Sequence, residues 1–387
     1  MIKVLLRAPV LSISGYGIHC RQIYRWMENR SDFDVTVQPL NWGNTTWMVN
    51  PEMEDGIIGR IMSKSVDTNE KFDLSFQVQL PDEWDPSIAS KNVGVSAFVE
   101  TDRCNPEWLG CINKMDRVIV PSEHVKRVIE NTGTTTTGVS VIGESYLGSI
   151  DSPEDNRLDL SLSTDFNFLI IGQMTGQKAD NDRKNLLNTI KWFCETFPND
   201  PDVGLIVKTN QGRATRIDRH RTEKSLREIV SHFRVGKYPK VYMLHGAMSE
   251  SEMVGLYRRD DVKALVSLTR GEGFGLPLLE AAACSLPVIA TNWSGHLDFL
   301  NLGKFLPINY IMSEIPDSRV DDRIFFKGMR WANPSEEDFK KKLYKFRHKY
   351  MLPQRWANEL SAEVRKKFSP EAVFQSYDLF MRKEFGL

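Results

Sequence analysis

The segment RGEGFGLPLLE, residues 270–280, joins a glycine-rich turn to two acidic residues and is the part of the chain best suited to chemistry. Its alternating glycines permit a tight turn whose backbone can approach a ligand closely. Glu272 lies inside this turn, and Glu280 lies further along, in a predicted helix. Pro277 suits the first turn of that helix, whose N-terminal N–H groups would attract an anion such as phosphate. Two carboxylates beside a phosphate cradle suit a ligand that carries both phosphate and hydroxyl groups, as a nucleotide sugar does.

The sequence on both sides predicts that this turn lies at the edge of a sheet. Residues 262–268 are apolar and β-prone, as expected of a buried strand, and residues 287–290 have the same character. Between them, residues 278–283 predict a helix, and residues 291–295 form a second loop that contains glycine. Taken alone, the segment would also suit an ordinary turn with solvated glutamates. The order of the flanking elements favours a ligand site.

This order of strand, acidic glycine loop, small-residue helix, strand and glycine loop resembles the donor site of retaining GT-B glycosyltransferases, especially glycosyltransferase family 4. Two glutamates separated by seven residues mark the site in that family, and Glu272 and Glu280 have this spacing. The resemblance is strong over residues 166–300; in the first half it rests on the organisation and on DRVIVPS, residues 116–122. It implies an α/β fold of GT-B architecture, with two Rossmann-like doubly wound domains that face each other across a cleft.

The length of 387 residues favours two domains. We predict a Rossmann-like acceptor-side domain over residues 1–150 and a Rossmann-like donor domain over residues 165–369. The intervening residues 151–164 are polar, with acidic residues and serines, which is typical of a linker. Residues 370–387 begin with a helical apolar pattern, and the resemblance implies that this helix packs back on the first domain.

Short apolar runs alternate with helical patterns in both halves, as in a doubly wound sheet. In the first half, strands are predicted at residues 2–7, 34–38, 74–77, 93–99, 115–120 and 139–142, and helices at 18–28 and 123–131. In the second half, further strands are predicted at 166–172, 204–208 and 241–244, and helices at 184–197, 213–233 and 253–257. Residues 304–327 show no clean period, and a helix is expected to begin at residues 335–338.

The resemblance implies a role for each residue of the donor site. Glu280 would bind the ribose hydroxyls of the nucleotide, and Glu272 would contact the transferred sugar. The sugar and the distal phosphate would be surrounded by the backbone amides of Gly273, Phe274, Gly275 and Leu276. The nucleotide base is expected near residues 245–252.

Negative charge that develops on a departing diphosphate must be met by positive charge. Arg183 and Lys184, predicted at the start of a helix, resemble the basic pair that serves this purpose in the family, and Lys184 is the stronger candidate. The family often has an arginine directly after the preceding strand; Gln173 stands there in this chain, and the loop 174–182 is longer than usual.

Candidates in the first half are a glycine turn and two acids. In the loop 11–17, Gly15 and Gly17 would permit the family's approach to the diphosphate, although a loop without a function suits the sequence as well. Many relatives have a histidine after the strand that corresponds to residues 93–99, whereas this chain has Glu100 and Asp102. Either acid could contact the sugar or accept the proton of the acceptor. His245 and His296 are expected in core or loop roles.

Composition restricts the class of protein. Hydrophobic residues at 41% and charged residues at 26% are typical of a globular protein, and the net charge of −1 supplies no overall field to hold nucleic acid or membrane. The five scattered cysteines are expected to be reduced, and no signal peptide or membrane span is recognised, so a cytoplasmic monomer or weak dimer is predicted. The histidines and cysteines lack metal-ligand spacing, and no obligatory cofactor or metal is expected.

These observations predict a metal-independent retaining glycosyltransferase, which moves a hexose or pentose from a nucleoside diphosphate sugar, with a UDP-sugar favoured, to a hydroxyl acceptor. Two basic runs, residues 213–224 and 340–349, allow a more specific function. The acceptor would then be hydroxymethylcytosine in bacteriophage DNA, unless the runs are only solvated helix faces. A non-catalytic sugar-nucleotide binder would also suit the sequence, as would an epimerase or phosphorylase of the same architecture.

Overall fold

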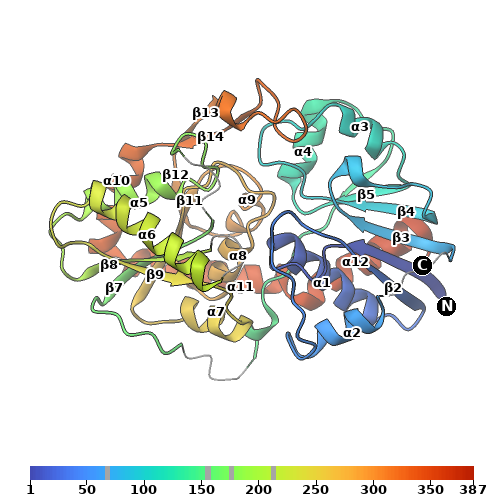
Figure 1. The fold of residues 1–387 in the computed structure, drawn as a ribbon, viewed down its shortest axis with the longest axis horizontal. Coiled ribbons are helices and arrows are strands. Elements are labelled where there is room, and N and C mark those ends of the chain that lie inside the picture. The colour runs from blue at the N-terminus through green and yellow to red at the C-terminus, as the bar shows by residue number, and fades with distance from the viewer. Residues whose placement is uncertain (66–69, 153–157, 174–177, 211–214) are drawn as a thin grey trace. The chain divides into compact units, whose positions relative to one another are not determined.

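The computed structural model describes residues 1–65, 70–152, 158–173, 178–210 and 215–387. The chain divides into two compact units (Figure 1). Unit 1 contains residues 1–145, 323–325 and 368–387, and unit 2 contains residues 146–322 and 326–367. Each unit has one six-stranded parallel sheet with helices packed on it, which confirms the predicted α/β class.

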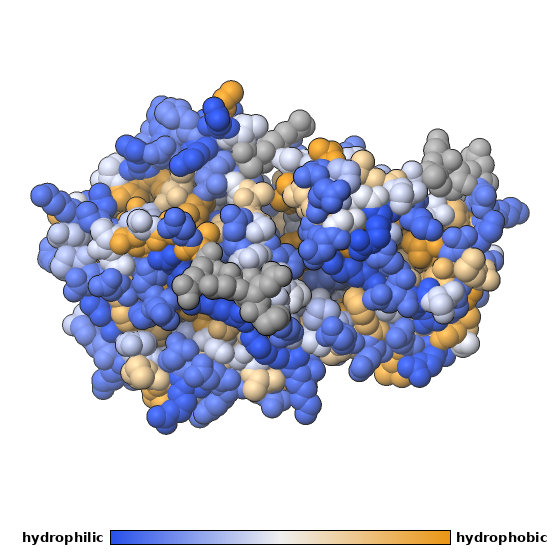
Figure 2. Space-filling view, turned by 90° about the horizontal axis from the view of Figure 1, so that it is seen from below, coloured by the Kyte–Doolittle hydropathy of each residue, from blue (hydrophilic) through white to orange (hydrophobic). Residues whose placement is uncertain are grey.

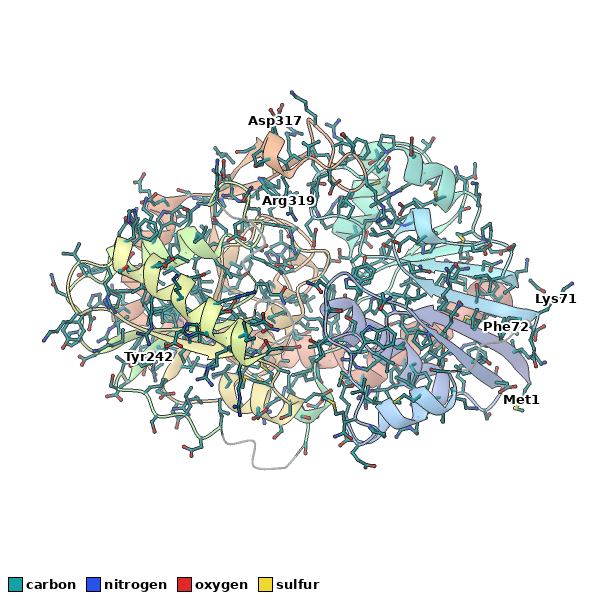
Figure 3. All side chains as sticks on the ribbon, in the orientation of Figure 1. Met1, Lys71, Phe72, Tyr242, Asp317 and Arg319 are labelled. Carbon is teal, nitrogen blue, oxygen red and sulfur yellow. The ribbon has the colours of Figure 1, made fainter. Side chains whose placement is uncertain are left out.

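Unit 1 is built on a sheet with the strand order β2-β1-β3-β4-β5-β6. Its strands are β1 (Ile2–Ala8), β2 (Phe33–Pro39), β3 (Phe72–Val78), β4 (Ala89–Val95), β5 (Arg117–Val120) and β6 (Val139–Val141). Its helices are α1 (Gly15–Glu28), α2 (Ile57–Ser63), α3 (Glu107–Ile112), α4 (Glu123–Thr132) and α12 (Pro370–Phe385), with a short 3-10 turn η1 (Pro81–Glu83). Met1 and Phe72 lie at the same edge of this sheet (Figure 3), so the carboxyl ends of the parallel strands, where ligands of such folds bind, lie at the opposite edge.

Helix α12 belongs to the core of unit 1, although it follows all of unit 2 in the sequence. Ser369 caps its N-terminus by accepting the N–H of Ala372, and Pro370 occupies the first turn. Its apolar face is fully buried, and the ring of Tyr377 stacks on Trp26 of α1 with 4.8 Å between centroids.

Unit 2 has a sheet with the strand order β12-β11-β10-β7-β8-β9 and a separate antiparallel hairpin, β13-β14. The strands are β7 (Phe166–Ile171), β8 (Val203–Thr209), β9 (Lys240–His245), β10 (Val262–Ser267), β11 (Val288–Thr291), β12 (Leu306–Ile308), β13 (Tyr310–Glu314) and β14 (Arg330–Pro334). The helices are α5 (Leu186–Thr196), α6 (Arg216–Phe233), α7 (Glu250–Tyr257), α8 (Leu276–Ala283), α9 (Leu297–Leu300), α10 (Glu336–Lys349) and α11 (Met351–Phe368), with 3-10 turns η2 (Gly148–Ile150) and η3 (Asp317–Arg319). Helix α5 packs between α6 and α10 in one layer (Figure 1).

Several predicted boundaries were wrong for local reasons. Strand β4 ends at Val95, four residues early, because Ser96 accepts the N–H of Phe98 and Phe98 adopts a φ of 51°. The region 304–327, which has no clean period, contains β12 and β13, and the helices α2, α3 and α11 were not predicted. Part of the predicted linker (153–157), part of the loop 174–182 (174–177) and the start of the predicted helix 213–233 (213–214) lie outside the described residues.

Among the described residues, no helix is long and apolar enough to cross a membrane. Hydrophilic residues cover most of the face seen in Figure 2. All five cysteines are free.

Candidate functional site

The acidic glycine loop lies between β10 and α8, at the carboxyl edge of the sheet of unit 2. Gly275 is the N-cap of α8 and has a φ of 105°, a conformation that favours glycine. The loop packs directly on the second glycine loop: a Cβ atom at Gly295 would lie 2.0 Å from the carbonyl oxygen of Gly273. The N–H of Gly295 also donates to the carbonyl oxygen of Glu272, at 2.9 Å. The turn therefore requires Gly275, and the contact between the two loops requires Gly295.

A chain of hydrogen bonds fixes the backbone at Glu272. Its N–H donates to Ser294 Oγ at 2.9 Å, and the Ser294 hydroxyl lies 3.3 Å from His296 Nδ1. His296 Nε2 lies 2.7 Å from the carbonyl oxygen of Thr291, so it must carry the proton and leave Nδ1 as the acceptor. Burial lowers the pKa of His296, which keeps the imidazole neutral, as this arrangement requires. Ser294 and His296 therefore position the loop. A core or loop role was expected for His296, whereas the role of Ser294 and this chain of hydrogen bonds were not predicted.

The Glu272 carboxylate is held by two cations from the segment that precedes α5. Lys184 Nζ lies 2.6 Å from one carboxylate oxygen and 2.7 Å from the other, and Arg183 Nη1 lies 3.6 Å away. Burial alone would raise the pKa of Glu272, but the charges of Lys184 and Arg183 outweigh it and hold the pKa at about 2. Glu272 is therefore ionised at any physiological pH. It cannot serve as a proton donor.

The segment that carries these cations was predicted as the start of a helix, and this was wrong by two residues. Helix α5 begins at Leu186, because Asn185 takes the left-handed conformation and the Asp182 carboxylate accepts the N–H of Leu186 at 2.7 Å. Arg183 and Lys184 therefore lie in the loop before the helix. Asp182 also completes an Asp-x-Asp spacing, residues 180–182, which was not recognised from the sequence. Within the described ranges, no group of three or more histidine, cysteine or acidic side chains is placed to hold a metal ion.

Arg270 ties this segment to the glycine loop. Its backbone N–H donates to the carbonyl oxygen of Arg183 at 2.8 Å, and its buried side chain donates to the carbonyl oxygens of Asp182 and Ala179. The guanidinium lies over the ring of Trp331, 5.5 Å from the centroid. Arg270 was not predicted as a functional residue, but it holds the residues that were.

Glu280 is in a different environment from Glu272. It is buried in α8 and accepts a hydrogen bond from the hydroxyl of Tyr257 at 2.7 Å. Burial raises the pKa of Glu280 to about 8, so the carboxyl is protonated near neutral pH. The side chain of Phe274 is also buried and packs on Phe299, which anchors the loop to α9. Leu276 is buried as the first residue of α8.

The predicted residues of the first half belong to unit 1. Gly15 and Gly17 lie in the first turn of α1, not in a loop, because Ser14 caps this helix. A Cβ atom at Gly17 would lie 1.9 Å from the carbonyl oxygen of Ser12, so packing alone explains this glycine, whereas Gly15 faces open space. Glu100 and Asp102 are half-buried in the segment after β4. The roles given to these four residues remain predictions.

Two doubly wound units with parallel sheets, and a glycine loop at the carboxyl edge of the second sheet, define the GT-B class of fold. Sucrose-phosphate synthase from Thermosynechococcus elongatus is similar over the whole of both chains, with a TM-score of 0.66 at 14% identity. A glycosyltransferase from Rickettsia africae is similar over 99% of this chain and 98% of its own, with a TM-score of 0.65 at 13% identity. HepE from Anabaena, solved in complex with UDP and glucose, covers 99% of this chain and 100% of its own, with a TM-score of 0.61 at 12% identity. At these identities the likenesses show the fold alone.

The sequence comparisons find that the segment with the glycine loop is similar to a known family. Residues 223–313, which include Glu272, Glu280 and the Ser294–His296 loop, match the family model of glycosyl transferases group 1. Glu272, Glu280 and the second glycine loop therefore lie in a segment that is similar to this family. The chain is also 28% identical to the serotype-specific mannosyltransferase WbdA of Escherichia coli over 200 residues, which are 48% of this chain. The match covers 22% of WbdA, so this chain spans about a fifth of that relative.

Proposed function

We propose that this protein is a glycosyltransferase that moves a sugar from a nucleoside diphosphate sugar to a hydroxyl group of an acceptor. The observation that carries the proposal is the ionic cluster that buried Glu272, on the glycine loop before α8, forms with half-buried Lys184 and Arg183 from the segment before α5. Its glycine loop lies in the segment that matches a glycosyltransferase family model.

The charge of the cluster suits a diphosphate. Two cations and one carboxylate leave one net positive charge in a poorly solvated loop, which an anion can neutralise. The N-terminal end of α8 adds a partial positive charge at the same loop. When a donor binds, its diphosphate shares the ammonium of Lys184 with Glu272. The cations then stabilise the charge that develops as the diphosphate departs.

The reaction that we propose breaks the bond between the anomeric carbon and the phosphate oxygen and forms a bond from that carbon to the acceptor oxygen. The proton of the acceptor hydroxyl passes to the departing phosphate oxygen, on the same face of the sugar, so that configuration is retained. Glu272 stays ionised throughout and accepts hydrogen bonds from sugar hydroxyls. Retention rests on the resemblance of the glycine loop and its two glutamates to the retaining family.

Glu280 is proposed to bind the ribose hydroxyls. Its carboxyl already accepts one hydroxyl donor, that of Tyr257, which supports a preference of Glu280 for hydroxyl partners. UDP is the favoured nucleotide, and Lys184 and Arg183 would supply the positive charge that a metal ion supplies in other transferases. Glu100 or Asp102 would contact the acceptor or the sugar.

A donor screen tests the proposal first. The unfolding temperature of the protein is measured with UDP, GDP, ADP and their sugar conjugates, because a ligand that binds the folded state raises this temperature. The preferred donor is then incubated with candidate acceptors in the presence of EDTA, and release of nucleoside diphosphate is measured. Release that requires an acceptor supports the transferase. Binding without release indicates a sugar-nucleotide binder, and conversion of the donor without an acceptor indicates an epimerase.

The acceptor screen includes duplex DNA that contains hydroxymethylcytosine. The exposed cations of α6 and α10 motivate this arm, because DNA phosphates bind such residues. Transfer to this duplex, lost when salt is raised, would identify the DNA-modifying enzyme. Absence of transfer with every sugar nucleotide tested would remove DNA as the acceptor and leave the transferase proposal to the remaining acceptors.

A further inference from the structure

Helix α10 and the first turns of α11 carry a concentrated positive charge that the donor site does not use. Residues 339–358 contain five lysines and two arginines and no acidic residue. Three of these cations pair with acids, two of which belong to the first turn of α10 itself: Lys340 with Glu195 and Glu336, Lys342 with Asp338, and Arg347 with Asp200. The other four are exposed, namely Lys341, Lys345, Lys349 and Arg355.

Large apolar side chains are exposed on the same stretch. Tyr344 is 57% exposed, Met351 68% and Leu352 51%. Lys341, Tyr344 and Lys345 share one face of α10, because residues three and four apart are neighbours on a helix. The core of unit 2 does not need these apolar groups, since Phe339, Leu343 and Phe346 fill the inner face of the same helix. Their exposure to water is unfavourable unless another surface covers them.

Two further lysines extend the charge from neighbouring elements. Lys263 of β10 lies 5.3 Å from the ring centroid of Tyr350, and exposed Lys304 lies 5.8 Å from that of Trp356. Both lysines therefore lie beside the stretch formed by α10 and the start of α11. We name it the α10–α11 surface, composed of Lys341, Tyr344, Lys345, Lys349, Met351, Leu352 and Arg355.

We propose that the α10–α11 surface binds the anionic face of a lipid bilayer. Positive charge attracts anionic lipid headgroups, and apolar tips between the charges can enter the boundary between headgroups and acyl chains. A nucleic acid would use the cations, but its phosphate backbone gives exposed methionine and leucine side chains no apolar partner. The pairing of Met351 and Leu352 with four exposed cations favours lipid for this reason. The proposal is independent of the reaction at the glycine loop.

Vesicle sedimentation with the full chain tests it. The wild type is expected to bind vesicles of phosphatidylcholine with phosphatidylglycerol and not vesicles of phosphatidylcholine alone. Replacing the four exposed cations by glutamine should weaken binding by at least about a hundredfold, because each contributes roughly a fivefold factor near an anionic surface and the factors multiply. Met351→Ser with Leu352→Ser should weaken it about tenfold while all charges remain.

A matched control removes four exposed cations from another helix of the same unit, by changing Arg216, Arg219, Arg221 and Lys224 of α6 to glutamine. This variant should bind anionic vesicles within about twofold of the wild type. Unfolding temperatures identify any variant that fails to fold, and the serine variant, which changes only exposed groups, keeps the test decisive. Three results would overturn the proposal: equal binding to both vesicle types, binding that the serine variant retains in full, or capture of duplex DNA by wild-type protein that ignores vesicles.

Discussion

Replacing Glu272 by glutamine should destabilise unit 2. It should also make the unfolding temperature of unit 2 less sensitive to a decrease in pH. The change leaves Lys184 and Arg183 close together beside a neutral amide in a buried loop. Holding the pKa of Glu272 at about 2, when its ordinary value is 4.5, corresponds to about 3 kcal/mol. For a folding unit of this size, 1 kcal/mol changes the unfolding temperature by about 2–4 °C, so a decrease of about 6–12 °C is expected at pH 7.

The size of this decrease should depend on pH. A carboxylate whose pKa is lower in the folded state contributes stability that is fully present above the unfolded pKa, near 4.5, and is lost as pH falls through the folded pKa of about 2. The difference in unfolding temperature between wild type and Glu272→Gln should therefore be constant from pH 7 to about pH 5 and should shrink below pH 4.5.

Scanning calorimetry from pH 7 to pH 3 measures both effects. Glu195→Gln is the control, because Glu195 also pairs with a lysine but at a more exposed position, where an ion pair contributes about 1 kcal/mol or less. The Glu272→Gln variant should also retain nucleoside diphosphate affinity while turnover falls, since the loop becomes more positive. Unchanged unfolding at pH 7, or a difference that persists undiminished at pH 3, would refute the assignment of the ion pair.

Three further predictions concern the neighbours of Glu272. Glu280→Gln should raise the unfolding temperature at pH 8.5 more than at pH 5. The reason is that a carboxyl with a raised folded pKa of about 8 makes the folded protein less stable as pH rises from 4.5 to 8. Equal effects of the substitution at both pH values would contradict the burial argument. Lys184→Met should weaken UDP binding about tenfold, as measured by calorimetric titration. The control Lys191→Met, on helix α5 itself, should leave UDP affinity unchanged. An equal loss of affinity in both variants would show that Lys184 does not belong to the site. His296→Phe removes the acceptor of the Ser294 hydroxyl and should lower kcat about tenfold at saturating donor with little change in KM. A rise in KM alone would show that His296 does not position Glu272.

The parts of the site that the sequence predicts are local in the chain. The glycine loop, Pro277 and helix α8 follow one another within a few residues, so propensity and spacing determine them. Ser294 and His296 reach Glu272 only because β11 pairs with β10, which brings two loops together across 22 residues of sequence. The periodicity of apolar residues along the chain does not predict such a contact.

The same distinction between local and distant contacts explains the errors in the fold. Hairpin β13-β14 pairs Tyr310 with Pro334, and the intervening residues hide the pairing from a local pattern. The sequence allows two explanations for Gly17, approach to a ligand and close packing. The position of the Ser12 carbonyl in the structure is needed to decide between them. Arg183 and Lys184 were wrongly assigned to a helix. The helix begins later, at Leu186, because the Asp182 side chain accepts the N–H of Leu186 and Asn185 is left-handed.

The place of α12 in the sequence has a consequence for synthesis on the ribosome. Most of unit 1 emerges first, yet the helix that stacks Tyr377 on Trp26 is translated only after all of unit 2. At typical elongation rates of about 5–20 residues per second, the nascent first sheet waits roughly 10–50 s for its last helix. During that interval the apolar residues that α12 covers are exposed to water. Newly made chains are therefore expected to need chaperones more than the finished protein does, and truncation before residue 370 should yield aggregated protein.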